Sequence, residues 1–202
     1  MFALVQDNTI TKMISGNRGI TLGDIQYPRS IFTLWSASEK EAIGIYEVVF
    51  NNTNKKDEAY YTNTNQSFAF ADGVVTASFG SATAKALADR NATDEDGVEL
   101  DPVVVIEGLK TKHKRIIKQQ ASSLLTPTDW YVIKATEVES YSAPSAITTY
   151  RANIRTASND MEVLIDACST VDELAALYQY VNTGTEEEPV MERPLGEFPE
   201  AV

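Results

Sequence analysis

Cysteine and histidine are almost missing from this chain of 202 residues, which contains one of each. A single cysteine excludes an internal disulfide framework, and the pair cannot supply the nitrogen and sulfur ligands of a zinc site. Cys168 lies beside Leu164 and Ile165 in an apolar helical pattern, which predicts a buried, unreactive thiol. His113 lies in a basic run without the serine, cysteine and carboxylate order typical of a hydrolase. We therefore predict no enzyme activity, no metal site and no cofactor.

Long apolar runs and an excess of positive charge are missing too. No stretch approaches the roughly 20 apolar residues that a membrane-spanning helix needs. Residues 1–8 have neither the basic start nor the apolar run of a signal peptide. The net charge is −12, whereas binding to nucleic acid phosphates needs a basic surface. We therefore expect synthesis in a cytoplasm, and partners other than membranes and nucleic acids.

One basic run in the middle of the chain is an exception to the negative charge. It consists of Lys110, Lys112, His113, Lys114, Arg115 and Lys118. On a helix these residues spread over more than half of the circumference, which is typical of a solvated face. The run could equally bind an acidic partner, including this chain's own acidic segments, and high salt should then weaken the contact.

Two candidate ligand motifs are incomplete. Gly16, Gly19 and Gly23 lie in a stretch that lacks the Gly-Lys-Ser/Thr ending of a phosphate-binding loop. Residues 91–102 are rich in acids, but no register has the ligand spacing of an EF-hand calcium loop. We interpret the glycines as turn residues and the acidic stretch as part of a solvated linker.

Residues 1–88 have the pattern of a small, antiparallel, β-rich domain. Alternating apolar residues and turn signals, among them Asp72-Gly73, predict a hairpin followed by a meander. The expected strands are 1–5, 9–14, 45–50, 60–64, 68–70 and 74–79. An apolar cluster at 27–35 is expected to pack on the first hairpin. Ser36 and Glu39 have the spacing of a capping box, which predicts a short helix that Gly44 ends.

The rest of the chain is predicted to divide into an acidic linker, a helical domain and a tail. The linker is 89–102, after a short helix expected at 81–90, and the helical domain is 103–181. Helical periodicity predicts helices at 109–125, from Pro127, from Pro144, at 160–168 and from Thr170. The predicted fold class is therefore α+β, with an antiparallel β-rich part followed by a C-terminal helical bundle and an extended acidic tail.

The segment 124–155 has the clearest helical periodicity in the chain. Pro127 ends one helix and is favoured in the first turn of the next, where Trp130 and Ile133 share one face. After Pro144, the apolar residues at three- and four-residue spacing are Ile147, Tyr150 and Ile154. We expect an antiparallel helical hairpin with Trp130 as its central packing residue.

The tail, 182–202, differs in composition from the helical domain. It contains three prolines and six glutamates but few large apolar residues, so alone it is expected to be extended or disordered. It is either a solubilising acidic tail or an arm that becomes ordered on another subunit. In the second interpretation its anchors are Val190, Met191, Leu195 and Phe198.

A pattern in the C-terminal half resembles a known group of proteins. It consists of Leu124, Leu125, Thr128, Asp129, Trp130, Ile133, Lys134, Glu137, Pro144, Tyr150, Arg151, Ile154 and Arg155. This pattern resembles the C-terminal end of small tail-associated proteins of tailed bacteriophages, which include tail-fibre assembly proteins and minor tail components. The segments 1–5, 27–35 and 41–48 are similar to them in style. The resemblance covers about half of the chain and involves structural rather than catalytic residues.

The resemblance implies a non-enzymatic structural protein of the phage tail. Such a protein would lie in the virion and bind other tail or fibre proteins, in several symmetric copies. One alternative is an assembly chaperone that is absent from the mature particle, and another is a cellular adaptor without a viral role. The candidate contact residues of the hairpin are Lys134, Glu137, Tyr150, Arg151 and Arg155. A pairing of Arg151 or Arg155 with Glu137 or Asp129 would make that arginine structural instead.

Overall fold

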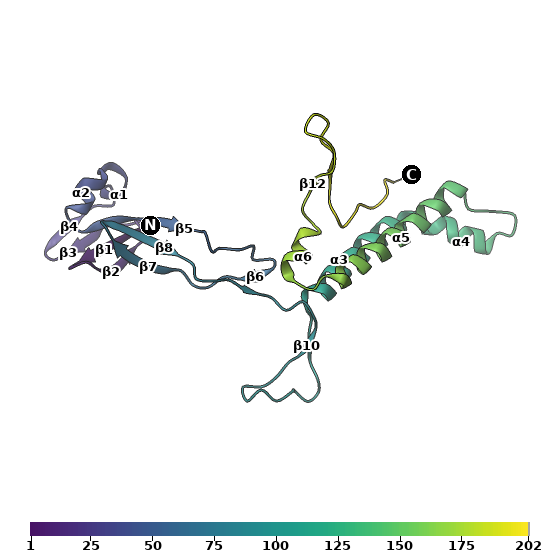
Figure 1. Ribbon diagram of the computed structural model, residues 1–202, viewed down its shortest axis with the longest axis horizontal. Coiled ribbons are helices and arrows are strands. Elements are labelled where there is room, and N and C mark those ends of the chain that lie inside the picture. The colour runs from purple at the N-terminus through teal and green to yellow at the C-terminus, as the bar shows by residue number, and fades with distance from the viewer. Residues whose placement is uncertain (202) are drawn as a thin grey trace. The chain divides into compact units, whose positions relative to one another are not determined.

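The computed structural model describes residues 1–201, in two compact units that meet in sequence between Thr83 and Ala84. The first unit contains a five-stranded sheet, and the second contains a pair of long helices with two short hairpins (Figure 1). The chain is therefore an α+β protein, as its sequence predicts. No helix within residues 1–201 is both long enough and apolar enough to cross a bilayer.

The sheet of the first unit is mixed. Its strands are β1 (Phe2–Gln6), β2 (Thr9–Ile14), β5 (Ile45–Asn51), β7 (Ser67–Ala71) and β8 (Val74–Ser78). They lie in the order β2-β1-β5-β8-β7, and β5 and β8 form the one parallel pair among them. The predicted β part is antiparallel throughout. The difference arises because the turn at Asp72 and Gly73 places β8 against β5 and leaves β7 at the edge.

Short elements complete the first unit, and those between β2 and β5 pack on one face of this sheet. They are β3 (Ile20–Leu22), β4 (Ile25–Tyr27), α1 (Ile31–Leu34), α2 (Ala37–Glu41), β6 (Tyr61–Thr62) and, at the end of the unit, β9 (Thr83–Ala84). The predicted capping box of α2 is present. The backbone N–H of Glu39 donates to Ser36 Oγ, and the Glu39 carboxylate accepts from the backbone N–H of Ser36. Gly44 follows the helix with a φ of 78°, as expected of a residue that ends a helix.

Two apolar clusters lie on opposite faces of the sheet, because successive residues of a strand point to opposite sides. The cluster beneath α1 contains Phe2, Leu4, Ile14, Ile31, Phe32 and Ile45. The cluster on the other face contains Ala3, Val5, Val48, Val75 and Ala77. The first cluster includes residues of the 27–35 segment, which confirms that this segment packs on the first hairpin. Pro28 and Leu34 are exceptions, since both are exposed, Leu34 to 79%.

The second unit is built on two antiparallel helices, α3 (Leu109–Leu125) and α5 (Ser145–Ala167). A turn of 3₁₀ helix, η1 (Thr126–Thr128), and α4 (Asp129–Glu137) follow α3, and α6 (Val171–Ala176) follows α5. The side chains buried in these two long helices include Ile117, Ala121, Tyr150, Ile154, Met161 and Ile165. The capping box predicted at Thr170 and Glu173 begins α6.

Two of the predicted helices differ in the structure. The sequence pattern predicts a break in α5 near Ser158, but the helix is continuous because no proline or glycine interrupts it and Ser158 is buried. The helix expected at 81–90 is absent. That segment is extended, and its carbonyls at Ala86 and Leu87 accept hydrogen bonds from the first backbone N–H groups of α3. These groups have no partner within a helix, so an extended segment satisfies them here.

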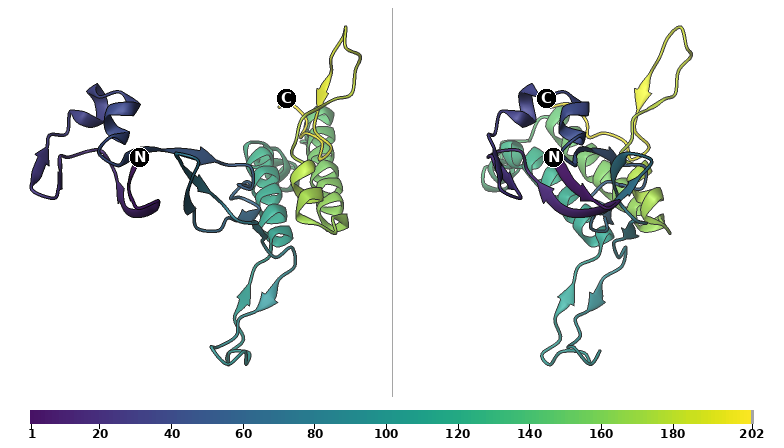
Figure 2. Two further views of the ribbon diagram at one scale, coloured as in Figure 1. Left: turned by 60° about the vertical axis from the view of Figure 1, so that its left-hand side comes forward. Right: turned by 90° about the vertical axis from the view of Figure 1, so that its left-hand side faces the viewer.

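The acidic linker and the tail both form β-hairpins. β10 (Arg90–Asn91) pairs with β11 (Val105–Ile106), and the hairpin 90–106 is called the acidic arm below. β12 (Val181–Asn182) pairs with β13 (Met191–Glu192). Both hairpins extend away from the two long helices of their unit (Figures 1 and 2). After β13 the chain returns to its own helical unit, where the backbone N–H of Leu195 donates to the carbonyl of Leu177.

His113 makes the stability of this unit dependent on pH. Its Nδ1 lies 2.8 Å from the hydroxyl oxygen of Tyr178, and burial lowers its pKa from the usual 6.5. The unfolded chain therefore binds the proton more readily, so the free energy of unfolding should fall as the pH drops below about 6.5. His113→Gln should flatten this fall between about pH 7 and pH 5, as measured by urea unfolding. An unchanged slope in the variant would contradict the prediction, since the chain has no other histidine.

Candidate protein-contact surface

The helix α4 has no buried residue. It continues the chain past the end of α3, whereas α5 packs along α3 itself (Figure 1). The sequence of α4 is nevertheless mainly apolar, and Trp130 and Ile133 are 50% and 55% exposed. A helix normally turns its apolar residues toward a core. The surface of α4 therefore has the character of a contact surface that lacks its partner within this chain.

The aromatic side chains near α4 form a platform. The ring centroid of Trp130 lies 4.2 Å from that of Tyr131 and 6.5 Å from that of Tyr141, which is nearly parallel to it. The Lys134 ammonium lies 4.4 Å from the Tyr141 centroid and 5.4 Å from the Trp130 centroid. These contacts hold large, rigid side chains in place at the surface. Aromatic residues of this kind are enriched at the centres of protein interfaces.

The expectation that Trp130 is the central packing residue of the hairpin is wrong. The antiparallel partner of α5 is α3, not α4. Leu124 and Leu125 at the end of α3 pack against the buried Tyr150 and Ile154 and so occupy the space that was expected for the indole ring. Helical spacing predicts correctly which residues share a face, but it does not show which helix covers that face.

Arg151 fixes the junction between α3 and α4 from the inside. Its guanidinium donates to the carbonyl of Leu125 at 2.8 Å and to Thr128 Oγ1 at 2.6 Å. It also forms an ion pair of 2.7 Å with Asp129 at the start of α4. Arg151 is only 7% exposed. One buried side chain of α5 therefore sets where α3 ends and where α4 begins.

The structure separates the five candidate contact residues of the hairpin into two groups. Tyr150 and Arg151 are buried, so they cannot be reached from outside, and the ion pair with Asp129 gives Arg151 the structural role considered above. Lys134, Glu137 and Arg155 are exposed. Whether these three bind a partner stays a prediction.

The sequence itself contains evidence for the exposed surface of α4, which the prediction of a packed helical hairpin does not use. Four consecutive residues, Trp130 to Ile133, are aromatic or aliphatic, and consecutive residues point to different sides of a helix. A short helix with apolar residues on every side cannot bury all of them against one neighbour. This argument adds Val132, which is 42% exposed, to the candidate surface, and Val138, which directly follows α4, is 41% exposed.

The four anchors predicted in the tail also differ in position. Val190 and Met191 are about half exposed on the tail hairpin, whereas Leu195 is 2% exposed and Phe198 is partly buried. Phe198 packs on the cluster of Ala121, Tyr150 and Ile154 of its own chain. Leu195 and Phe198 therefore hold the tail on its own helical unit, and contact of Val190 and Met191 with another subunit stays a prediction.

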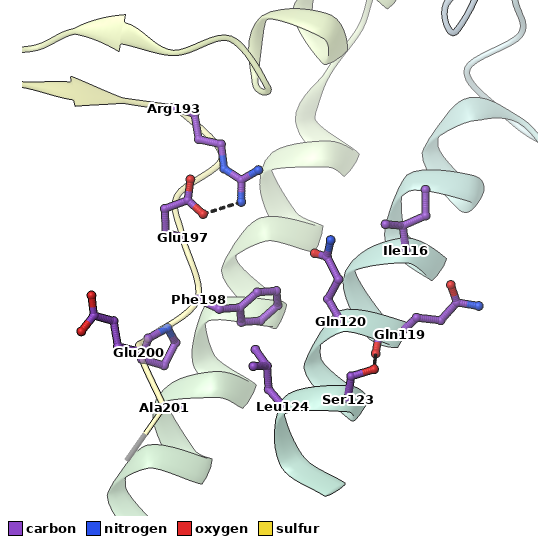
Figure 3. A pocket seen from close by; sticks show the side chains of 11 residues that line it. Ile116, Gln119, Gln120, Ser123, Leu124, Arg193, Glu197, Phe198, Glu200 and Ala201 are labelled. Atoms are coloured by element: carbon purple, nitrogen blue, oxygen red, sulfur yellow. Dashed lines mark hydrogen bonds and ion pairs between the residues drawn. The ribbon is translucent and has the colours of Figure 1, made fainter. Parts of the chain in front are cut away.

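The end of the tail and α3 border a groove of about 620 Å³ (Figure 3). Ile116, Gln120 and Leu124 line it from α3, and Phe198 lines it from the tail. The Arg193 guanidinium forms an ion pair of 2.8 Å with Glu197, which holds the turn of the tail beside the groove. We call this feature the apolar groove.

Groups with shifted pKa values do not gather at one place. Burial raises the pKa of the Cys168 thiol, whose Sγ contacts the carbonyl of Leu164 at 3.4 Å, and the thiol is buried as predicted. Hydrogen bonds from Gly108 and Thr111 lower the pKa of Asp89. Within residues 1–201 no three histidine, cysteine, aspartate or glutamate side chains are grouped closely enough to hold a metal ion.

Comparison with known proteins identifies no relative of this chain. No protein family, no curated protein and no solved structure matches this chain.

Proposed function

We propose that this chain is a non-enzymatic structural protein of a bacteriophage tail that binds another tail or fibre protein through the surface of α4. The observation that carries the proposal is a mainly apolar helix of nine residues with none of them buried. Its exposed residues include Trp130, Val132 and Ile133. Apolar side chains at this density are typical of a surface that is covered in a complex.

The resemblance to tail-associated phage proteins supports the viral setting. The residues that carry the resemblance also build the α4 surface: Arg151 fixes the start of the helix, and Trp130, Ile133 and Lys134 lie on it. The residues of the resemblance therefore include both those that hold α4 in place and those that form its exposed surface. This agreement between pattern and geometry is the reason for preferring a tail protein to a cellular adaptor.

The test is peptide mass spectrometry on purified particles of the phage that encodes the chain, quantified against the major tail protein. We expect a fixed ratio, which would also give the number of copies per tail. A phage with Trp130→Ser and Ile133→Ser should yield tails that lack the partner contact and few infectious particles. Val163→Ser is the matched control, because Val163 is 66% exposed on α5 but lies outside the α4 surface.

An assembly chaperone is the second candidate. It is favoured by the exposure of Trp130 and Ile133 in the free chain, because a chaperone presents an apolar surface to an unfinished partner and later releases it. Absence of the chain from mature particles, together with its presence in lysates of infected cells, would support the chaperone and exclude the structural role. Absence from both would leave the cellular adaptor.

A further inference from the structure

Helix α3 carries two hollows that lie side by side along its length. One is the apolar groove, which includes Ile116, Leu124 and Phe198. The other, about 450 Å³ in volume, is lined by Lys114, Arg115 and Lys118 together with small polar side chains. We call it the basic groove. Gln119 lines both, so the two grooves are adjacent faces of one helix.

The acidic arm has two parts that complement these grooves. Its carboxylates are Asp94, Glu95, Asp96, Glu99 and Asp101, and residues 91–106 contain no lysine or arginine. Its returning segment, Val103 to Ile106, includes β11 and has four consecutive apolar residues that are 58%, 49%, 56% and 40% exposed. An exposed apolar strand of this kind is a template for contact with another chain.

The charges and lengths of the two surfaces match. Residues 110–118 contain five lysine or arginine residues, and α3 contains no acid, although the whole chain has a net charge of −12. The segment 103–106 is about 13 Å long when extended, at about 3.3 Å per residue. The α3 segment 116–124 beside the apolar groove is about 14 Å long, at about 1.5 Å per residue.

Two of the three basic side chains of the basic groove remain accessible, whereas Lys114 is 27% exposed and is held by an ion pair of 2.8 Å with Asp166. Arg115 pairs with Glu107 at 3.0 Å and Lys118 pairs with Glu162 at 3.1 Å, but the two basic side chains are 56% and 66% exposed. Exposed pairs of this kind contribute little and can exchange partners. Glu200 borders the apolar groove, which favours an uncharged strand there over the acidic tip of the arm.

We propose that the acidic arm of one copy binds α3 of a second copy. Val103 to Ile106 enters the apolar groove, and the carboxylates of the arm lie against Arg115 and Lys118. The arm extends away from α3 of its own unit (Figures 1 and 2), so a second copy supplies the groove. The contact is a property of the chain itself and holds whether or not the chain belongs to a phage tail.

The first experiment is sedimentation equilibrium of the purified full chain at micromolar concentrations. We expect a dimer or larger assembly at about 0.1 M salt, and weaker association at about 1 M salt, where charges are screened within about 3 Å. Val103→Ser with Val105→Ser should raise the dissociation constant by at least about tenfold, or 1.4 kcal/mol. Val49→Ser with Val163→Ser is the matched control, because these valines are 54% and 66% exposed elsewhere. It should leave association unchanged.

A charge exchange tests the pairing directly. Arg115→Glu with Lys118→Glu should weaken self-association, and so should Glu95→Lys with Asp96→Lys. Mixing the two variants should restore association, because the basic arm of the second then meets the acidic α3 of the first. Circular dichroism of each variant checks that its helices are intact.

Three results would overturn the proposal. One is a monomer at every concentration in low salt. Another is an assembly that both the serine and the charge variants leave unchanged. The third is dissociation of the two charge variants that mixing fails to reverse. Failure of the tail role alone would appear in the particle analysis and would leave these measurements unaffected.

Discussion

Replacing Arg151 with alanine should lower the free energy of unfolding of the helical unit by about 2–4 kcal/mol. The guanidinium donates to Leu125 and Thr128 at the end of α3, and its removal also leaves a cavity in a region that is nearly closed to solvent. The ion pair with Asp129 contributes less, because the aspartate side chain is 50% exposed. Lost hydrogen bonds and lost packing therefore account for most of the expected change.

Urea unfolding followed by far-UV circular dichroism measures this change, since α3 and α5 contain most of the helix in the chain. Arg155→Ala is the control, because Arg155 is exposed and its hydrogen bond to the carbonyl of Arg151 is long, at 3.4 Å. It should change stability by less than about 0.5 kcal/mol. Equal stability of Arg151→Ala and the natural chain would show that Arg151 is not the structural residue its contacts indicate.

The features that the sequence predicts well are local. The capping boxes at Ser36 and Thr170 depend on residues three positions apart, and the structure contains both. The turn at Asp72 and Gly73 depends on two residues that tolerate positive φ, and both adopt it. The helix predicted at 109–125 has the observed bounds. In each case the interaction that decides the structure lies within a few residues.

The features that the sequence predicts poorly depend on distant partners. The parallel pairing of β5 with β8 depends on which strand of the β7–β8 hairpin lies next to β5. The two strands of this hairpin are too similar in composition for the sequence to show which one it is. Trp130 has the spacing of a core residue, but α3 rather than α4 covers α5. Tyr150 and Arg151 belong to the same pattern as Lys134 and Glu137, yet only the first two are buried. A single sequence does not distinguish a buried residue that supports a surface from an exposed residue that is part of that surface.

Replacing Gly108 with alanine should also lower the free energy of unfolding of the helical unit by about 2–4 kcal/mol. An added Cβ would overlap the backbone carbonyl groups of Leu87 and Ala88, which cannot move aside as a flexible side chain can. The same segment caps α3, because Gly108 N–H donates to the Asp89 carboxylate at 2.7 Å and Lys110 N–H donates to the Leu87 carbonyl at 3.0 Å. Any shift that relieves the overlap therefore strains these hydrogen bonds.

Gly97→Ala is the matched control for this prediction. Gly97 lies at the tip of the acidic arm with a φ of 82°, and a Cβ there would meet no atom within 4 Å. Its substitution should therefore cost only the strain of positive φ, about 1 kcal/mol, and only locally. Urea unfolding of the two variants compares a glycine surrounded by backbone atoms with a glycine that has open space around it.

Gly108 also lies at the root of the acidic arm, so Gly108→Ala should weaken self-association without changing a residue of the proposed interface. Unchanged stability together with unchanged association would show that residues 87–89 do not hold the arm on α3.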